Sequence, residues 1–234
     1  MDVLPSVPVR HLGPLIQLKR STLGEQVLRA LTIELGPLAD AASFVDHPDG
    51  LYISKDGSIG IAASRPGSDT CIDLMQRALV AIRRTALPLD SAAQAVSALG
   101  ELASNIEEHS EDREMGVIAF EVNGSFVGLY ASDKGRGVLK SLRENPTYRN
   151  LEDAGEALGL VIQEGVSSSS QAGRGRGFRP LFVGLAGHAG LLRFRSGGAL
   201  LELNGFGEGK PMQELKERAQ AVGFHVFVHC TFRR

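Results

Sequence analysis

Two apolar runs joined by Asn123-Gly124 constrain the fold of this chain more than any other feature of its sequence. The runs cover residues 117–122 and 126–131, and Asn-Gly favours a tight hairpin turn because both residues tolerate left-handed backbone angles. The pattern therefore predicts two antiparallel strands. The second strand leads directly into Asp133-Lys-Gly-Arg-Gly137, so we expect a glycine-rich loop at its end.

A long helix is predicted before this hairpin, beginning after Pro88 and ending near His109. Polar residues form a second stripe on it, because Glu101, Asn105 and His109 recur at helical spacing of about 100° per residue. One edge of a core helix thus carries a carboxylate, an amide and an imidazole. The apolar stripe beside it consists of Ala95, Leu99, Leu102, Ala103 and Ile106.

The N-terminal part of the chain predicts a small α/β arrangement. A capping-box pattern opens a helix expected over residues 22–36, and a hairpin with a type I′ turn at Asp56-Gly57 is expected over residues 51–62. Ser68 is expected to cap a helix that runs to about Arg84. The apolar stripe predicted for that helix consists of Ile72, Met75, Leu79 and Ile82.

Residues 145–172 are polar, and we interpret them as a mobile lid with a short helix over residues 154–163. The elements predicted after the lid are a helix over 178–185, a hairpin over 191–203 around Gly197-Gly198, a helix over 211–222 and a strand over 224–232.

The composition is that of a globular protein, with 234 residues of which 43% are hydrophobic, and this excludes disordered and fibrous classes. The net charge of -2 argues against a protein that coats nucleic acid or an anionic membrane. Cys71 and Cys230 lie in apolar patterns and are expected to be buried and reduced. Because no apolar stretch has bilayer length and no signal peptide is apparent, we expect a cytoplasmic protein.

A second glycine-rich segment, Gly173-Arg174-Gly175-Arg176-Gly177, precedes the apolar helix predicted at residue 178. Glycine lacks a Cβ, so backbone N–H groups can approach phosphate oxygens closely, and a helix N-terminus adds partial positive charge. This segment therefore suits a polyphosphate. The roles of Arg174 and Arg176 stay open between phosphate contacts, a docking patch for an acidic partner and a solvated loop.

The polar stripe and the first glycine loop suit the rest of a nucleotide. Asn105 offers a hard oxygen to Mg²⁺, and Glu101, one turn earlier, can orient or deprotonate an attacking hydroxyl or water. Asp133 can accept a hydrogen bond from the exocyclic amine of a base while the ring lies against the bare backbone of Gly135 and Gly137. The three segments together predict an adenine slot, a metal site and a phosphate cradle.

In this order and spacing the motifs resemble those of the GHKL ATPases, which include gyrase, heat-shock chaperone and histidine kinase ATP-binding domains. Glu101-Leu-Ala-Ser-Asn-Ile-Glu-Glu-His109 is similar to their N box, and the segments beginning at Asp133 and at Gly173 are similar to their two glycine boxes. The resemblance covers residues 90–204 and the last predicted strand.

The resemblance implies an α+β two-layer sandwich of the Bergerat type, in which a mixed sheet carries helices on one face. It implies ATP and Mg²⁺ as ligands, with Glu101 as general base and Asn105 as the Mg²⁺ ligand. Asp133 would be the adenine partner, and Gly135, Gly137 and the segment 173–177 the nucleotide cradle. We divide the chain into an N-terminal extension, residues 1–85, and an ATP-binding domain, residues 86–234.

The chain lacks a recognisable transducer domain, membrane sensor or phosphoacceptor helix, so it looks most similar to the small stand-alone bacterial members, including the anti-sigma-factor serine kinases. Those transfer phosphate to a small STAS-type partner, which suggests a STAS-like or sigma-factor-type regulator as partner, or a second copy of this chain. Three activities stay open: protein phosphorylation, slow ATP hydrolysis, and nucleotide-gated binding without turnover. Nucleic-acid binding through the glycine-arginine segment is a weaker alternative, and it predicts a steep salt dependence.

A metal site in the last strand is not expected. His225 and His229 lie about 13 Å apart in an extended strand, and Cys230 points to the opposite face.

Overall fold

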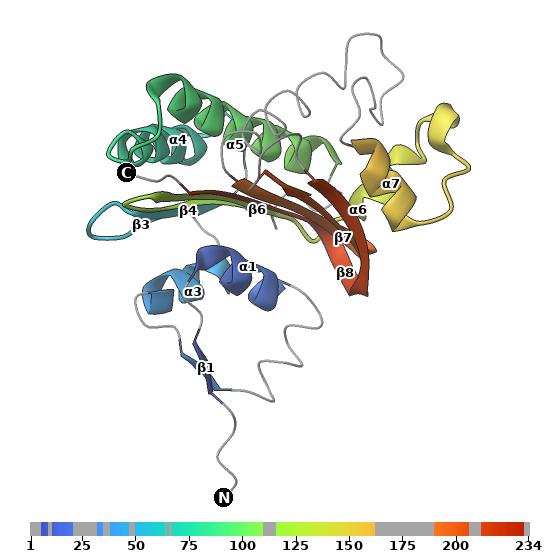
Figure 1. The fold of residues 1–234 in the computed structure, drawn as a ribbon, viewed down its shortest axis with the longest axis horizontal. Coiled ribbons are helices and arrows are strands. Elements are labelled where there is room, and N and C mark those ends of the chain that lie inside the picture. The colour runs from blue at the N-terminus through green and yellow to red at the C-terminus, as the bar shows by residue number, and fades with distance from the viewer. Residues whose placement is uncertain are drawn as a thin grey trace, which may run out of the picture.

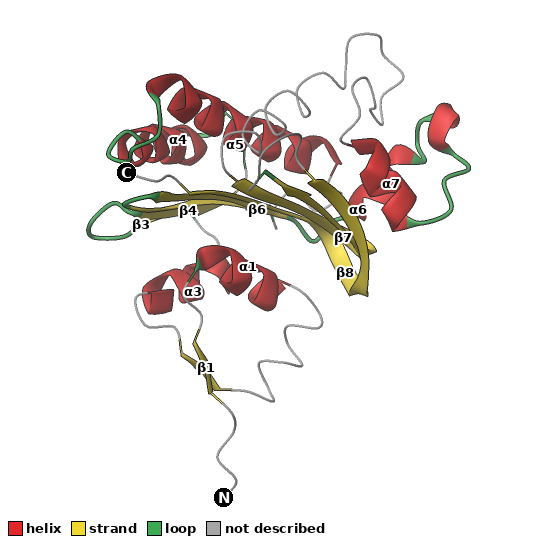
Figure 2. Ribbon diagram, viewed as in Figure 1, coloured by secondary structure: helices red, strands yellow, loops and turns green. Residues whose placement is uncertain are grey.

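We analysed a computed structural model, which describes residues 6–8, 11–20, 32–34, 38–46, 50–63, 65, 67–109, 116–161, 190–205 and 212–231. The fold is α+β, and an antiparallel sheet packs against helices, as Figures 1 and 2 show. Helices α4 and α5 cover one face of the sheet, and α1 and α3 lie on the other. The resemblance implied helices on one face, and the helices on the other face, α1 and α3, both lie within the N-terminal extension of residues 1–85.

Over the chain that the structure describes, six strand segments lie in the order β3-β4-β5-β6-β8-β7, and the segment β7 is itself a hairpin. Each neighbouring pair in this order is antiparallel, so the expected mixed sheet is corrected to an antiparallel one within that part of the chain. The strands are β3 (Leu51–Ile53), β4 (Ile59–Ala63), β5 (Val117–Asn123), β6 (Phe126–Ser132), β7 (Gly190–Asn204) and β8 (Met212–Thr231).

The hairpins predicted over residues 51–62 and 117–131 are confirmed. β5 and β6 pair in register around the turn at Gly124, which has a φ of 54°. β3 and β4 also pair, but the turn differs from the predicted one: Gly57 N–H donates to the Ser54 carbonyl at 2.9 Å, and Ser54 N–H donates to the Ile59 carbonyl at 2.9 Å. The connection is therefore longer than a two-residue type I′ turn.

β7 folds back on itself at the predicted position. Gly205 N–H donates to the Gly190 carbonyl at 2.9 Å, and the Arg193 guanidinium pairs with the Glu202 carboxylate. Neither contact can form along a straight strand of this length, because extended residues advance about 3.3 Å each. The chain reverses at Gly197, whose φ is 56°, so the predicted hairpin is confirmed.

The helix predicted over residues 211–222 was wrong, because β8 runs through it as a strand. Asn204 faces Met212 and Ala199 faces Glu217 in the β7–β8 ladder. Helix propensities differ by less than about 1 kcal/mol per residue, so pairing with the exposed edge of a neighbouring strand can override them. The strand predicted from residue 224 is confirmed as the second part of β8.

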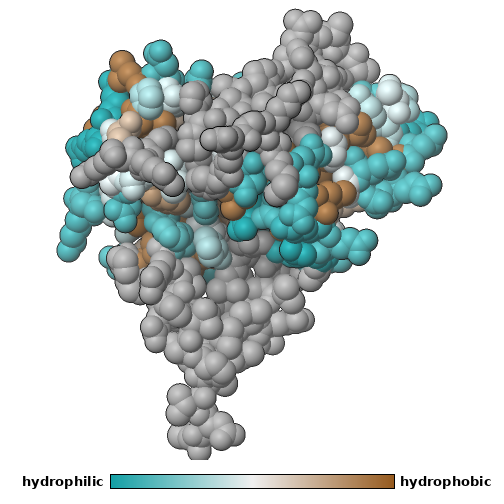
Figure 3. All heavy atoms as spheres, in the orientation of Figure 1, coloured by the Kyte–Doolittle hydropathy of each residue, from teal (hydrophilic) through white to brown (hydrophobic). Residues whose placement is uncertain are grey.

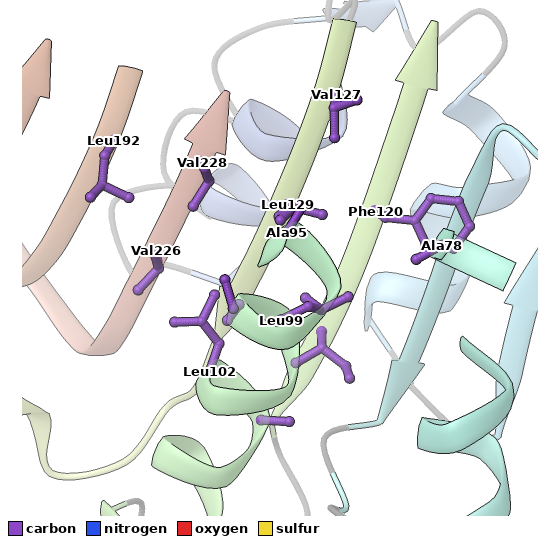
Figure 4. Packing of buried hydrophobic residues seen from close by; sticks show 14 of the residues in the cluster. Ala78, Ala95, Leu99, Leu102, Phe120, Val127, Leu129, Leu192, Val226 and Val228 are labelled. Carbon is purple, nitrogen blue, oxygen red and sulfur yellow. The ribbon is translucent and has the colours of Figure 1, made fainter. Parts of the chain in front are cut away.

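Helix α5 (Leu89–His109) forms where it was predicted, and its apolar stripe is the one expected. Each of these side chains is at most 1% exposed, and they face the sheet. Figure 4 shows Leu99 and Leu102 beside Leu129 of β6 and Val226 of β8. The buried members of the stripe are Ala95, Leu99, Leu102, Ala103 and Ile106.

Helix α4 (Asp69–Ile82) also forms as predicted, and Ser68 caps it by accepting a hydrogen bond from Cys71 N–H at 3.3 Å. The predicted stripe is confirmed in part, because Ile82 is buried and Met75 and Leu79 pack partly buried against the core. Ile72 is 46% exposed, whereas the buried side chains of the helix are those of Cys71, Leu74, Ala78, Ala81 and Ile82. Because α4 packs on both α5 and the sheet, its buried face is rotated away from Ile72 towards Leu74 and Ala78.

Helices α1 (Leu12–Arg20) and α3 (Ala39–Asp46) pack on the second face of the sheet, against a cluster that includes Ile61, Tyr130 and Phe227. The strands β1 (Ser6–Pro8) and β2 (Thr32–Glu34) pair in parallel outside the main sheet. The helix predicted over residues 22–36 is contradicted at β2, and its first part lies outside the described residues.

The segment after the first glycine loop forms α6 (Gly137–Leu142), the 3-10 turn η2 (Pro146–Tyr148) and α7 (Ala154–Val161). The short helix predicted at residue 154 is confirmed as far as residue 161, and Leu158 on it is buried in the core. Figure 3 shows a mostly hydrophilic surface around these elements. The rest of the predicted lid lies outside the described residues.

The proposed boundary at residue 85 falls between α4 and α5, which pack against each other. β4, before the boundary, pairs with β5 after it.

No helix in the described ranges is long and apolar enough to cross a membrane.

His229 lies on the second face of the sheet, where burial makes its protonation unfavourable. Its ring contacts those of Tyr130 and Phe126, with centroid distances of 5.6 and 5.3 Å. The Nε2 atom is buried and has no hydrogen-bond partner among the residues that the structure describes. Burial, with smaller effects from the charges of His11 and Arg193, lowers the pKa of His229 to about 4.

We expect the free energy of unfolding to fall as the pH drops, because the unfolded histidine binds a proton near its usual pKa of 6.5 and the folded one only near 4. The loss between pH 7 and pH 4 should be about 2 to 3 kcal/mol. His229→Phe should remove the part of this pH dependence that comes from His229 and leave the part that comes from other titratable groups. Urea unfolding of both proteins at several pH values checks it, and parallel pH profiles would contradict it.

Candidate functional site

Asp133 is the best-defined residue of the candidate site. It follows the last residue of β6, and its side chain is buried, with 5% of its surface exposed. Its Oδ1 atom accepts hydrogen bonds from Gly135 N–H at 2.8 Å and from Phe224 N–H at 3.3 Å. The Asp133 N–H in turn donates to the Phe224 carbonyl at 3.0 Å. The carboxylate is thus held at the end of the strand from two directions.

The glycines of the first loop join this carboxylate to α6. Gly137 opens the helix with a φ of 75°, a left-handed conformation that side chains disfavour. A Cβ at this position would lie 2.8 Å from the Ser196 hydroxyl, so glycine is also required for space. The same hydroxyl accepts from Val138 N–H at 3.0 Å and donates to the Gly223 carbonyl at 2.9 Å. The loop therefore contacts the tip of the β7 hairpin.

Glu101 and Asn105 lie one turn apart on α5, as predicted. Glu101 is exposed and Asn105 is half-buried, so the edge of the helix on which they lie reaches solvent. α5 packs against β6, the strand that ends at Asp133. The two parts of the candidate site therefore come from neighbouring elements. Of His109, the structure describes only the backbone at the end of α5.

The second glycine segment, with Gly173, Arg174, Gly175, Arg176 and Gly177, lies outside the described residues, as does the helix predicted over 178–185. Its role as a phosphate cradle stays a prediction.

Three residues of the site were missed by the sequence analysis: Ser132, Gly223 and His225. Ser132 and His225 face each other across the β6–β8 pair, and Gly223 precedes the same part of β8. A glycine just before a predicted strand was a weak signal for Gly223. No signal in the sequence pairs residue 132 with residue 225, because their contact depends on the register of two strands far apart in the chain.

The last strand carries Cys230 together with His225 and His229. No group of three or more His, Cys, Asp or Glu side chains could hold a metal ion within the described ranges. Cys230 packs in the core on the α5 side, whereas His229 contacts Tyr130 on the other face, as predicted. Cys71 and Cys230 are free and buried, and burial raises the pKa of Cys230 to about 12, which keeps it a thiol.

No protein-family model matches this chain, and no curated protein is significantly similar to it in sequence.

Proposed function

We propose that this chain is a cytoplasmic ATP- and Mg²⁺-binding protein of the GHKL class, with a Bergerat-type fold, that acts as a regulatory switch on a protein partner. The observation that carries the proposal is the buried Asp133 carboxylate, held at the end of β6 beside the glycine-rich turn into α6.

Asp133 is suited to reading the base of the nucleotide. A carboxylate accepts hydrogen bonds, and an exocyclic amine of a purine donates them. Two backbone N–H groups, of Gly135 and Phe224, fix the orientation of the side chain before a ligand arrives. Such preorganisation strengthens recognition because little conformational freedom is lost on binding.

The polar edge of α5 is suited to the phosphate end. The side-chain oxygen of Asn105 is the kind of hard donor that Mg²⁺ takes together with water and phosphate oxygens. Glu101 is exposed one turn earlier, where its carboxylate can accept a proton from a partner hydroxyl or a water. Bound Mg-ATP would supply the transferable phosphoryl group. The residues present therefore fit the ligand set that the sequence resemblance implies.

The remaining parts of the proposal concern the phosphates and the partner. The segment 173–177, with Arg174 and Arg176, would hold the phosphate chain, and closure of residues 145–172 would couple the nucleotide to a partner-binding surface. The partner would be a STAS-like or sigma-factor-type regulator, or a second copy of the chain.

Calorimetric titration of Mg-ATP and Mg-ADP into the purified protein tests the proposal. Asp133→Asn keeps the shape of the side chain but removes its charge and one acceptor oxygen, so ATP affinity should fall at least about 10-fold. Asp40→Asn, at an exposed carboxylate on α3, is the matched control and should bind like the native protein. Absence of ATP binding by the native protein would overturn the proposal.

Glu101→Gln is expected to reduce phosphate release or transfer by about 100-fold or more while ATP binding persists, because a general base contributes on that order. Glu107→Gln changes another exposed glutamate of α5 and should leave turnover unchanged. Steady-state phosphate release and a calorimetric Kd for each variant separate the two effects. Turnover that survives in Glu101→Gln would contradict the general-base role, and ATP binding without native turnover would favour a non-catalytic, nucleotide-gated interaction module.

A further inference from the structure

The turn of residues 222–224, which leads into the last part of β8, packs directly against Asp133. Gly223 has a φ of 76°, and a Cβ added there would lie 2.1 Å from the Asp133 carbonyl oxygen. The next residue, Phe224, bonds to Asp133 in both directions through its backbone N–H and carbonyl. The position of this turn therefore determines where the Asp133 carboxylate lies.

A buried histidine ties this turn to the strand that carries Asp133. His225 is 0% exposed, and its Nε2 atom lies 3.0 Å from the Val222 carbonyl, on the far side of Gly223. Its Nδ1 atom lies 2.8 Å from the hydroxyl of Ser132, the residue before Asp133. The imidazole thus spans from the turn to the end of β6.

The chemistry of the two contacts explains why an imidazole suits this position. A carbonyl oxygen can only accept, so Nε2 carries the proton and donates it to Val222. In the neutral ring Nδ1 then accepts from the Ser132 hydroxyl. Ser132 is also 0% exposed, so both polar groups lose water on folding, and the hydrogen bond between them replaces part of that hydration. A phenylalanine ring would fill a similar volume without either bond.

We propose that His225 is a positioning residue for base recognition, acting on Asp133 through Ser132 and the 222–224 turn. This inference rests on the proposed function and adds to it the buried residues that hold the Asp133 carboxylate in place. His225 does not touch the ligand. It keeps the Asp133 carboxylate at the one orientation in which it can accept from that amine.

ATP and inosine triphosphate, which replaces the 6-amino group by an oxo group, are the probes. The native protein should bind ATP at least about 10-fold more tightly than inosine triphosphate, because the carboxylate lacks its donor in the second. His225→Phe and Ser132→Ala should lower this ratio to about 3 or less by weakening ATP alone. His229→Phe, on the same strand and away from Asp133, should keep the native ratio.

Calorimetric Kd values for both nucleotides with each variant test whether His225 positions Asp133. A lower ratio of ATP affinity to inosine triphosphate affinity in the two variants supports the positioning role. A general loss of structure would instead weaken the binding of both nucleotides equally. An unchanged ratio, or equal weakening of both, overturns the role of His225 and leaves the proposed function intact. If the native protein binds neither nucleotide, or both equally, the proposed function or the base recognition fails and this inference fails with it. Should His225→Phe not fold, Ser132→Ala decides alone.

Discussion

Gly223→Ala is expected to lower the free energy of unfolding by at least about 3 kcal/mol, through left-handed strain and a steric conflict together. The φ of Gly223 is 76°, and the new Cβ would meet the Asp133 carbonyl oxygen at 2.1 Å and its carbonyl carbon at 2.7 Å. Because these atoms belong to the backbone of β6's end, no side-chain rotation can relieve the contact. Urea unfolding followed by circular dichroism measures the loss.

Gly124→Ala is the matched control for this prediction. Gly124 has a similar left-handed φ of 54°, but nothing lies within 4 Å of a Cβ built on it. Its substitution should therefore cost only the strain, about 1 kcal/mol. Equal losses in the two variants would show that the turn at residue 223 can move away from Asp133, in contrast to the packing described above.

Removing the carboxylate of Glu121 is expected to destabilise the protein by about 3 kcal/mol, because its buried partners would lose their hydrogen bonds. Glu121 lies on β5 and is 7% exposed. Its Oε2 atom accepts from Leu12 N–H, in the first turn of α1, at 2.8 Å and from the Tyr130 hydroxyl at 3.2 Å. Its Oε1 atom lies 3.2 Å from His11 Nδ1.

Glu121→Ala should also loosen α1 from the sheet. Gly13 of this helix approaches the Tyr130 ring so closely that a Cβ would lie 2.5 Å from Tyr130 Cε1, which shows how tightly the helix seats. Hydrogen exchange of the backbone amides in α1 should rise in the variant more than exchange in α5. Glu121→Gln keeps an acceptor oxygen, so its free energy of unfolding should fall less than that of Glu121→Ala. Glu107→Ala changes an exposed position and should have nearly the native free energy of unfolding. Unchanged exchange in α1 would contradict the anchoring role.

The local elements around the hairpin of β5 and β6 followed directly from the sequence. Asn123-Gly124 specifies its own turn, and the stripe of α5 contains enough buried side chains to orient the helix without help from its neighbours. α4 shows the limit of this kind of argument. Periodicity predicted a stripe through Ile72, but packing of α4 between α5 and the sheet exposes Ile72 and buries Leu74 and Ala78.

The candidate site also combines residues that local motifs predict with residues that only the tertiary structure brings to it. The Asp133 loop, Glu101 and Asn105 were predicted from motif spacing, because each motif lies within a few consecutive residues or helical turns. His225 and Gly223 were not found as site residues, because they reach Asp133 only through the pairing of β6 with β8. A prediction of that pairing needs the order of the strands in the sheet, which no local pattern encodes.

The sequence by itself determined where the strands of the β3–β4 and β5–β6 hairpins lie, which face of α5 is buried and where the first glycine loop begins. These depend on turn chemistry and periodicity, which act between near neighbours. The tertiary structure decided the antiparallel order of the sheet, the second layer of helices on its other face and the strand conformation of residues 212–222. Each of those depends on contacts between segments distant in the chain, whose combined free energy exceeds local preferences of less than about 1 kcal/mol per residue.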